Sequence, residues 1–314
     1  MADPVSQMSF NGFARLKLFW ALSRTPHGLL DMCTPAFAAL LWRGGVPPIN
    51  VILIGLLTIF AGYTAVYALN DLVDYRVDRE KAAAGVLSAG TSDLDGVIIR
   101  HPMAQGLLSF TEGLVWAVSW SVVALIGAYV LNPVCVVIFL GGCVFEAAYC
   151  WMWRVSPYRT LVSGAVKTSG SVAAVFAVDP HPSAAFLIAL FFTLFLWEVG
   201  GQNIPNDLTD LEEDRRMRAR TIPVSWGVER AVAIAGAALA AAVLLSVGVF
   251  LLSSLHHREF LALLTLGVGC GLLIGPGLRL FREKDGASAM ALFNRASYYP
   301  LALLAVVLLG LMAA

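Results

Sequence analysis

The stretch NDLVDYRVD runs from Asn70 to Asp78, and NDLTDLEED runs from Asn206 to Asp214, so the chain carries the pattern N-D-L-x-D-x-x-x-D twice. The two copies begin 136 positions apart (206 minus 70), and each follows a long apolar run. Charged residues at membrane depth are costly and are, by default, candidates for a functional site. The repeats therefore mark the first place to look for a functional site.

The composition is that of an integral membrane protein. Hydrophobic residues make up 59% and charged residues 13% of the 314 positions, and the mean hydropathy is +0.77. These values lie far from the averages of soluble domains. The formal net charge is zero, which predicts no nucleic-acid partner.

The apolar runs predict the fold. A bilayer core of about 30 Å needs roughly 20 apolar residues to cross it. We predict an all-α, polytopic membrane protein, a single domain over residues 1–314, in which nine transmembrane helices surround a central chamber. The expected spans are 28–46, 49–69, 113–131, 134–152, 161–178, 184–203, 229–252, 260–278 and 297–313.

Two segments outside these spans have predicted positions. The mixed segment at about 10–24 is expected to lie along the membrane interface. The loops at about 70–112 and 204–228 are expected to cap the site. No cleaved signal peptide is expected, because no short apolar core with a small-residue cleavage site opens the chain.

The distribution of basic residues predicts the orientation. With nine spans and a cytoplasmic N-terminus, only Arg43 and Arg258 of the 21 Lys and Arg residues fall outside, which leaves 19 inside (21 minus 2). Basic residues in short loops favour the cytoplasmic side. We therefore predict a multi-pass protein of the cell membrane, whose N-terminus and active-site loops are cytoplasmic. Membrane lipids are expected partners.

The spacing of the aspartates predicts a metal site. If each helix continues at about 100° per residue, the three aspartates of each repeat fall within about 60° of arc, whereas Glu212 and Glu213 point away. Three carboxylates on one face repel one another unless cations lie between them. Oxygen ligands without nearby His or Cys favour Mg²⁺, which often binds together with substrate phosphates. The predicted metal ligands are Asp71, Asp74, Asp78, Asp207, Asp210 and Asp214.

Two other interpretations of the repeats carry less weight. A single acidic cluster at a helix end is often only solvated, but two matching clusters on the same side of the membrane favour one shared site. A Ca²⁺ loop is a poor alternative, because neither repeat has the Gly and terminal Glu spacing of an EF-hand.

With these motifs in place, the sequence resembles the UbiA superfamily of intramembrane prenyltransferases over nearly its whole length. That resemblance implies two Mg²⁺ ions that bridge the aspartates to the diphosphate of an isoprenoid donor. In one departure, His101 separates Arg100 from Pro102, where family members often have an Arg-Pro pair. Besides the repeats, the similar motifs are Arg24-Thr-Pro-His27, Ser156-Pro-Tyr-Arg159, Asn203-Ile-Pro-Asn-Asp207 and Thr221-Ile-Pro-Val-Ser-Trp-Gly227.

The resemblance and the chemistry together give a set of candidate site residues. For Arg159 the alternative is an ordinary positive-inside anchor. For Glu198 the alternatives are a structural pair and a neutral hydrogen-bonded acid. Candidates for catalysis are Asp71, Asp74, Asp207, Asp210 and Arg159. Candidates for substrate binding are Asn70, Asp78, Arg100, Lys167, Glu198, Asn203, Asn206 and Asp214.

We predict Mg²⁺-dependent transfer of a polyprenyl group from an isoprenoid diphosphate to a small lipophilic acceptor, with release of diphosphate. An aromatic quinone-type precursor is the favoured acceptor. Fixed cations stabilise the leaving diphosphate, and a water-poor chamber protects the allylic carbocation. The alternatives are an isoprenoid cyclase built on the same motifs and a non-enzymatic transporter of an anionic lipid.

Overall fold

The computed structural model describes residues 12–85 and 99–313, and all of the regular structure in these ranges is helical. The predicted all-α, polytopic membrane fold is confirmed. Eight helical stretches are long and apolar enough to cross a membrane. They are Ile49–Val73, Phe110–Leu131, Pro133–Arg154, Arg159–Val178, Ala184–Thr209, Val228–Leu251, Arg258–Glu283 and Gly286–Met312.

The first predicted span, 28–46, is divided in the structure. Helix α2 (Thr25–Asp31) ends one residue before α3 (Cys33–Arg43) begins, and Met32 forms the joint. Neither helix is long enough by itself to cross a bilayer core of about 30 Å. The count of nine spans therefore stays a prediction, as does the interfacial position of α1 (Gly12–Leu22).

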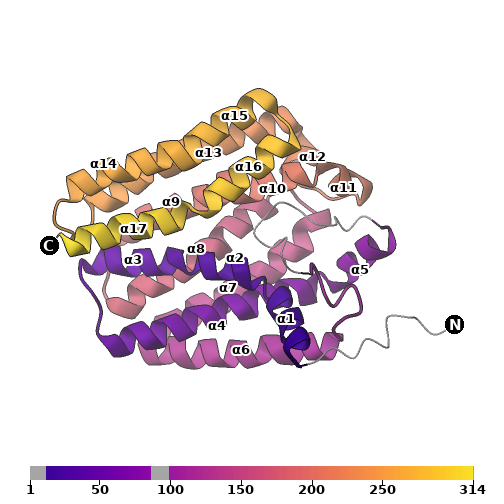
Figure 1. Cartoon of the computed structure of the whole chain (residues 1–314), viewed down its shortest axis with the longest axis horizontal. Helices are drawn as coiled ribbons and strands as arrows, with labels where there is room; N and C mark the ends of the chain where they lie inside the picture. The colour runs from indigo at the N-terminus through magenta and orange to yellow at the C-terminus, as the bar shows by residue number, and fades with distance from the viewer. Residues whose placement is uncertain (1–11, 86–98, 314) are drawn as a thin grey trace.

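The long helices run side by side along the longest axis of the molecule (Figure 1). The short helices gather at one end, away from the C-terminus, so this end collects segments that are distant in sequence. The long helices include α4 (Ile49–Val73), α6 (Phe110–Leu131), α7 (Pro133–Trp151), α8 (Arg159–Val178) and α13 (Val228–Leu251). The short helices at that end are α5 (Tyr75–Ala83), α11 (Leu211–Arg216) and α12 (Ile222–Trp226).

Two of the membrane-spanning stretches contain a π-helical segment. One, Glu198–Asn203, joins α9 (Ala184–Trp197) to α10 (Ile204–Thr209). The other, Cys270–Ile274, joins α14 (Arg258–Gly269) to α15 (Gly275–Glu283). Short π-helical segments inside α-helices often mark functional sites. The chain ends with α16 (Gly286–Ser297) and α17 (Tyr299–Met312).

The π-helical segment Glu198–Asn203 is fixed by close packing. A Cβ at Gly200 would lie 2.7 Å from the carbonyl oxygen of Ala235 on α13, so only glycine permits this approach. Small residues allow helix backbones to pack closely within membranes. On the preceding turn, Trp197 Nε1 donates a 2.9 Å hydrogen bond to the carbonyl oxygen of Ala296.

The outer surface of the bundle is apolar. Leu53, Val137 and Leu244 are 61%, 70% and 69% exposed, and each lies within a long helix. Such residues are stable in contact with lipid tails rather than water. Together with the eight candidate spans, they identify a multi-pass membrane protein.

Candidate active site

A single large cavity, of about 730 Å³, contains every polar residue predicted for the site. The two aspartate repeats, 136 positions apart in sequence, line the same end of it. The predicted residues in its wall are Asn70, Asp71, Asp74, Asp78, Arg100, Arg159, Lys167, Glu198, Asn203, Asn206, Asp207, Asp210 and Asp214.

Both repeats interrupt their helices at the second aspartate. Helix α4 ends at Val73 and α5 begins at Tyr75, so Asp74 forms the joint, and Asp210 forms the same joint between α10 and α11. The backbone at Asp210 has φ −94° and ψ 12°, outside ideal α geometry. The sequence analysis assumed a constant rotation of about 100° per residue around the helix axis, and this regularity ends at these joints.

This break corrects one prediction. Glu213 was expected to point away, but it lines the cavity and pairs with Lys81 at 3.0 Å. The Lys81 ammonium in turn lies 4.4 Å from the ring centre of Trp153. Glu212 does point away: it is exposed and accepts a 2.8 Å hydrogen bond from Arg215.

The carboxylates at the acidic end of the cavity are largely buried. Burial, assisted by the charges of Glu213 and Asp214, raises the pKa of Asp210 to about 6. Burial also raises the pKa of Asp74 and of Asp214. Within the described residues, Oδ2 of Asp78 and Oδ2 of Asp207 are buried without a hydrogen-bond partner. Buried carboxylates of this kind fit a bound cation.

Arg159, the first residue of α8, is a buried basic group beside Asp207 of the second repeat. It is only 7% exposed, and its Nη1 lies 3.9 Å from Oδ1 of Asp207. The guanidinium also lies 4.1 Å from the ring centre of Tyr149, which fixes its plane. Tyr149 accepts a 3.2 Å hydrogen bond from Asn203, so the predicted Arg159 and Asn203 belong to one network.

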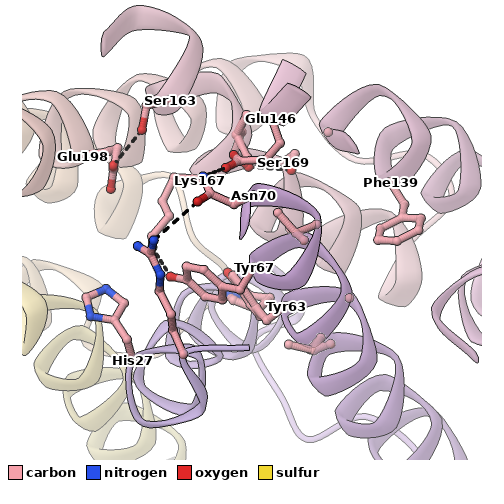
Figure 2. Close-up of a pocket in the computed structure, with 18 of the residues that line it drawn as sticks. His27, Tyr63, Tyr67, Asn70, Phe139, Glu146, Ser163, Lys167, Ser169 and Glu198 are labelled. Atoms are coloured by element: carbon pink, nitrogen blue, oxygen red, sulfur yellow. Dashed lines mark hydrogen bonds between the residues drawn. The ribbon is translucent and has the colours of Figure 1, made fainter. Parts of the chain in front are cut away.

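Lys167 lies away from the aspartates of the two repeats. It lies beside the turn of α4 that precedes the first repeat. Its ammonium is 2.5 Å from Oδ2 of Asp31. It is also 2.9 Å from the hydroxyl of Tyr67 (Figure 2). Tyr67 precedes Asp71 by one helical turn. The structure therefore places Lys167 in a polar cluster with Asp31 and Tyr67, one helical turn from the first repeat.

Glu198 has an open hydrogen-bonding position. Ser163 donates a 2.9 Å hydrogen bond to its Oε1, whereas its buried Oε2 has no partner within the described residues (Figure 2). Nine residues of ideal α-helix would place Glu198 about 180° from Asp207 around the axis. The intervening π-helical segment adds a residue to the turn and brings both side chains to the cavity.

The two asparagines that begin the repeats hold neighbouring side chains. Asn70 donates a 2.6 Å hydrogen bond to Glu146, and its Oδ1 lies 3.4 Å from Nη2 of Arg24. Asn206 Nδ2 lies 3.4 Å from Oδ2 of Asp210. Both asparagines therefore orient ionisable groups at the acidic end of the cavity.

Sequence reasoning did not assign two residues that contact the first repeat. Arg24 Nη2 lies 3.7 Å from Asp71, and the signal for it is the Arg24-Thr-Pro-His27 motif. His101 lies between Asp71 and Asp78, and its only signal is its unusual place between Arg100 and Pro102. Burial alone would lower the pKa of His101, but the two carboxylates raise it to about 9.

The profile of the UbiA prenyltransferase family matches residues 32–311. A digeranylgeranylglyceryl phosphate synthase of Thermococcus sibiricus is 24% identical over 214 residues, which cover 68% of this chain and 70% of that protein.

Solved structures have the same fold. A UbiA homologue from Aeropyrum pernix has a TM-score of 0.69 at 20% identity, covering 90% of this chain and 97% of that one. A homologue from Archaeoglobus fulgidus bound to GPP and Mg²⁺ has a TM-score of 0.67 at 18% identity, covering 92% and 99%.

Proposed function

Because the chain belongs to the UbiA prenyltransferase family, we propose that it transfers a polyprenyl group from an isoprenoid diphosphate to a hydroxyl group of a lipophilic acceptor. The observation that carries this proposal is the shared cavity, in which both aspartate repeats line one end and apolar side chains line much of the rest. An aromatic quinone-type acceptor finds no support among the relatives. Their name, digeranylgeranylglyceryl phosphate synthase, instead favours an acceptor of the glyceryl phosphate type.

The acidic end of the cavity fits a divalent cation. Oxygen ligands from both repeats line this end, and within the described residues the buried Oδ2 atoms of Asp78 and Asp207 have no hydrogen-bond partner. We propose that Asp71, Asp74, Asp207 and Asp210 hold Mg²⁺, with one ion at each repeat. Bound Mg²⁺ would stabilise the negative charge that grows on the departing diphosphate. The GPP and Mg²⁺ found together in the Archaeoglobus fulgidus homologue support this choice of ion.

Arg159 supplies a fixed positive charge for the same diphosphate. Its guanidinium is held against the ring of Tyr149, so little side-chain entropy is lost when it binds an anion. A guanidinium donates two parallel hydrogen bonds to phosphate oxygens. As the C1–O bond of the donor breaks, the diphosphate leaves with the electron pair and its attraction to Arg159 increases.

The apolar wall of the cavity accommodates the prenyl chain and excludes water. Ile59, Val66, Phe139, Leu304 and Leu308 contribute to this wall. Water would capture the allylic cation, so a water-poor chamber directs that cation to the acceptor.

Glu198 is the group that we assign to the acceptor. Glu198 lines the cavity, and its Oε2 has no hydrogen-bond partner among the residues that the structure describes, so it can accept a hydrogen bond from an acceptor hydroxyl. When the hydroxyl oxygen forms its bond to C1 of the prenyl group, the hydroxyl proton has to leave. A carboxylate beside it is a suitable proton acceptor.

The orientation of the site in the cell is part of the proposal. The excess of basic residues on the side that carries both repeats favours a cytoplasmic active site and a cytoplasmic N-terminus.

Product analysis tests the function. Purified protein is given polyprenyl diphosphates of several lengths with a glyceryl lipid phosphate or with an aromatic quinone precursor, and the products are identified by mass spectrometry. We expect a prenyl ether of the glyceryl lipid and one diphosphate released per product. Prenylation of the aromatic compound alone would contradict the acceptor assignment, and absence of any prenylated product would contradict the transferase.

A further inference from the structure

The imidazole of His101 lies between two buried aspartates of the first repeat. Its Nδ1 is 3.2 Å from Oδ1 of Asp71 and 3.0 Å from Oδ2 of Asp78. The two aspartates are 3% and 4% exposed. His101 itself has a left-handed backbone, with φ 48°, which is uncommon for a residue other than glycine.

Hydrogen bonding alone does not account for this arrangement. One ring nitrogen carries at most one hydrogen, so Nδ1 can donate to only one of the two carboxylates. Asp71 is its hydrogen-bond partner, and Oδ2 of Asp78 is left without one among the described residues. A buried carboxylate oxygen without a partner is costly. A cation bound by all three side chains would remove that cost.

The spacing of these atoms fits such a cation. Ligand atoms at 2.0–2.1 Å from an octahedral ion lie about 3 Å from their neighbours around it. The two distances to Nδ1, 3.2 and 3.0 Å, are close to this value. The three ligand atoms all lie within 4.8 Å of one another, and the cluster contains no residue of the second repeat.

We propose that His101, Asp71 and Asp78 form a mixed nitrogen and oxygen site that prefers a first-row transition metal ion, such as Mn²⁺ or Co²⁺, over Mg²⁺. Imidazole is a better ligand for these ions than for Mg²⁺, which prefers oxygen. The second repeat offers only oxygen atoms as side-chain metal ligands, so the two ion positions differ in metal preference. This inference rests on the proposed role of the first repeat in metal binding.

The same contacts have a second interpretation, in which His101 is a positive charge that neutralises the aspartates. A fixed charge competes with any divalent cation, so its removal would tighten the binding of Mn²⁺ and Mg²⁺ alike. A ligand has the opposite effect, because its removal weakens Mn²⁺ binding and changes Mg²⁺ binding much less. The two interpretations therefore predict changes of opposite sign.

Metal binding to the purified full-length protein tests the inference without any turnover. Mn²⁺ is added in the absence of diphosphate, and pulsed electron paramagnetic resonance detects the ¹⁴N coupling of a bound imidazole. Competition with Mg²⁺ gives the ratio of the two affinities. We expect ¹⁴N coupling in the wild type and a preference for Mn²⁺ of about tenfold or more.

His101→Gln should lose the coupling and most of the preference for Mn²⁺. His27→Gln is the matched control, because His27 lines the same cavity but lies beside Asp31, at 3.7 Å, instead of the first repeat. It should retain both properties. Circular dichroism and size-exclusion chromatography establish that the variants are folded. If His101→Gln is unstable, the wild-type spectrum still shows whether an imidazole nitrogen binds Mn²⁺.

Three results would overturn the inference: no ¹⁴N coupling in wild type with bound Mn²⁺, coupling that persists in His101→Gln, or tighter binding of both ions by that variant. Bound Mn²⁺ without nitrogen coupling leaves the proposed function intact. Failure of the protein to bind either ion contradicts the proposed metal role of the aspartates as well, so the two failures are distinguishable.

Discussion

Asp74 and Asp210 occupy equivalent joints in the two aspartate repeats. The amide of Asp74 donates to the carbonyl oxygen of Asn70 at 2.9 Å, and the amide of Asp210 donates to that of Asn206 at 3.1 Å. One turn later, Asp78 and Asp214 donate to Asp74 and Asp210, both at 2.9 Å. The two repeats therefore have the same local fold as well as the same sequence pattern.

This equivalence predicts similar effects of matched substitutions. Asp74→Asn and Asp210→Asn should each lower prenyl transfer by roughly 10² or more, because each removes one charged oxygen from the electrostatic stabilisation of the diphosphate. The Mg²⁺ concentration needed for half-maximal activity should rise in both. Diphosphate release across a Mg²⁺ titration measures the two effects. The control is Glu212→Gln, whose exposed side chain points away from the cavity and should leave turnover unchanged.

Arg159 is expected to act on the donor alone. Arg159→Ala should depress turnover with every acceptor by a similar factor, roughly 10² or more, because the lost charge stabilises the leaving diphosphate. Arg159→Lys should recover only part of the activity, since an ammonium does not reproduce the guanidinium fork. Steady-state rates with at least three acceptors provide the comparison. Normal turnover in Arg159→Ala would remove this residue from the site.

Glu198 is expected to act on the acceptor. Glu198→Gln keeps the size of the side chain but removes its negative charge, so it should change the ranking of acceptors and leave the affinity for the prenyl diphosphate within about threefold. Competition between pairs of acceptors in one reaction measures the ranking. Ser163→Ala is an informative companion, because it removes the 2.9 Å hydrogen bond to Oε1 and leaves the carboxylate in place. An unchanged ranking in Glu198→Gln would make Glu198 structural.

The carboxylates also predict how stability depends on pH when no metal is bound. The pKa of Asp210 is raised to about 6, whereas it is near 3.8 for an ordinary aspartate. Between these values the folded protein binds more protons than the unfolded chain, so the free energy of unfolding falls as pH rises. His101, with a pKa raised to about 9, adds to this fall above about pH 6.5.

We therefore expect the metal-free protein to melt at a lower temperature near pH 7.5 than near pH 5. Added Mg²⁺ should raise the melting temperature more at the higher pH, because it binds the deprotonated carboxylates. Thermal unfolding with and without Mg²⁺ at the two pH values measures both effects. A metal-free protein that becomes more stable on going from pH 5 to pH 7.5 contradicts the predicted sign.

Cysteine labelling tests the orientation. In a background without the five native cysteines, single cysteines at Asn132 and His256 should react with an impermeant reagent in intact cells. A cysteine at Arg218 should react only after the membrane is opened, because basic residues mark the cytoplasmic side. The reverse pattern would place the active site outside.

Much of the fold was predictable because length and apolarity suffice to identify a membrane helix. The position of both repeats at one cavity was predictable because the two repeats have the same pattern and carry acidic residues that are rare in membrane helices. The orientation of Glu213 was not predictable, because it depends on the helix break at Asp210. The residue types around Asp210 and Glu213 give no signal of a break.

Two further features depend on tertiary packing. The π-helical segment at Glu198–Asn203 requires the close approach of Gly200 to Ala235, which a single sequence does not specify. From the sequence, Lys167 is a candidate for binding phosphate. In the structure its partner is Asp31, which is 136 residues away and lies on α2. Pairings between distant helices of this kind have no local signal.

Diphosphate release by Asp71→Asn, by Asp207→Asn and by the double variant tests the central claim, that the two repeats form one metal-dependent site. In wild type, release should stop with chelator and return with Mg²⁺. Each single variant should lose as much activity as the double variant, because residues that act as a unit are not additive. Full turnover in either single variant, or release that persists in chelator, would contradict the shared site.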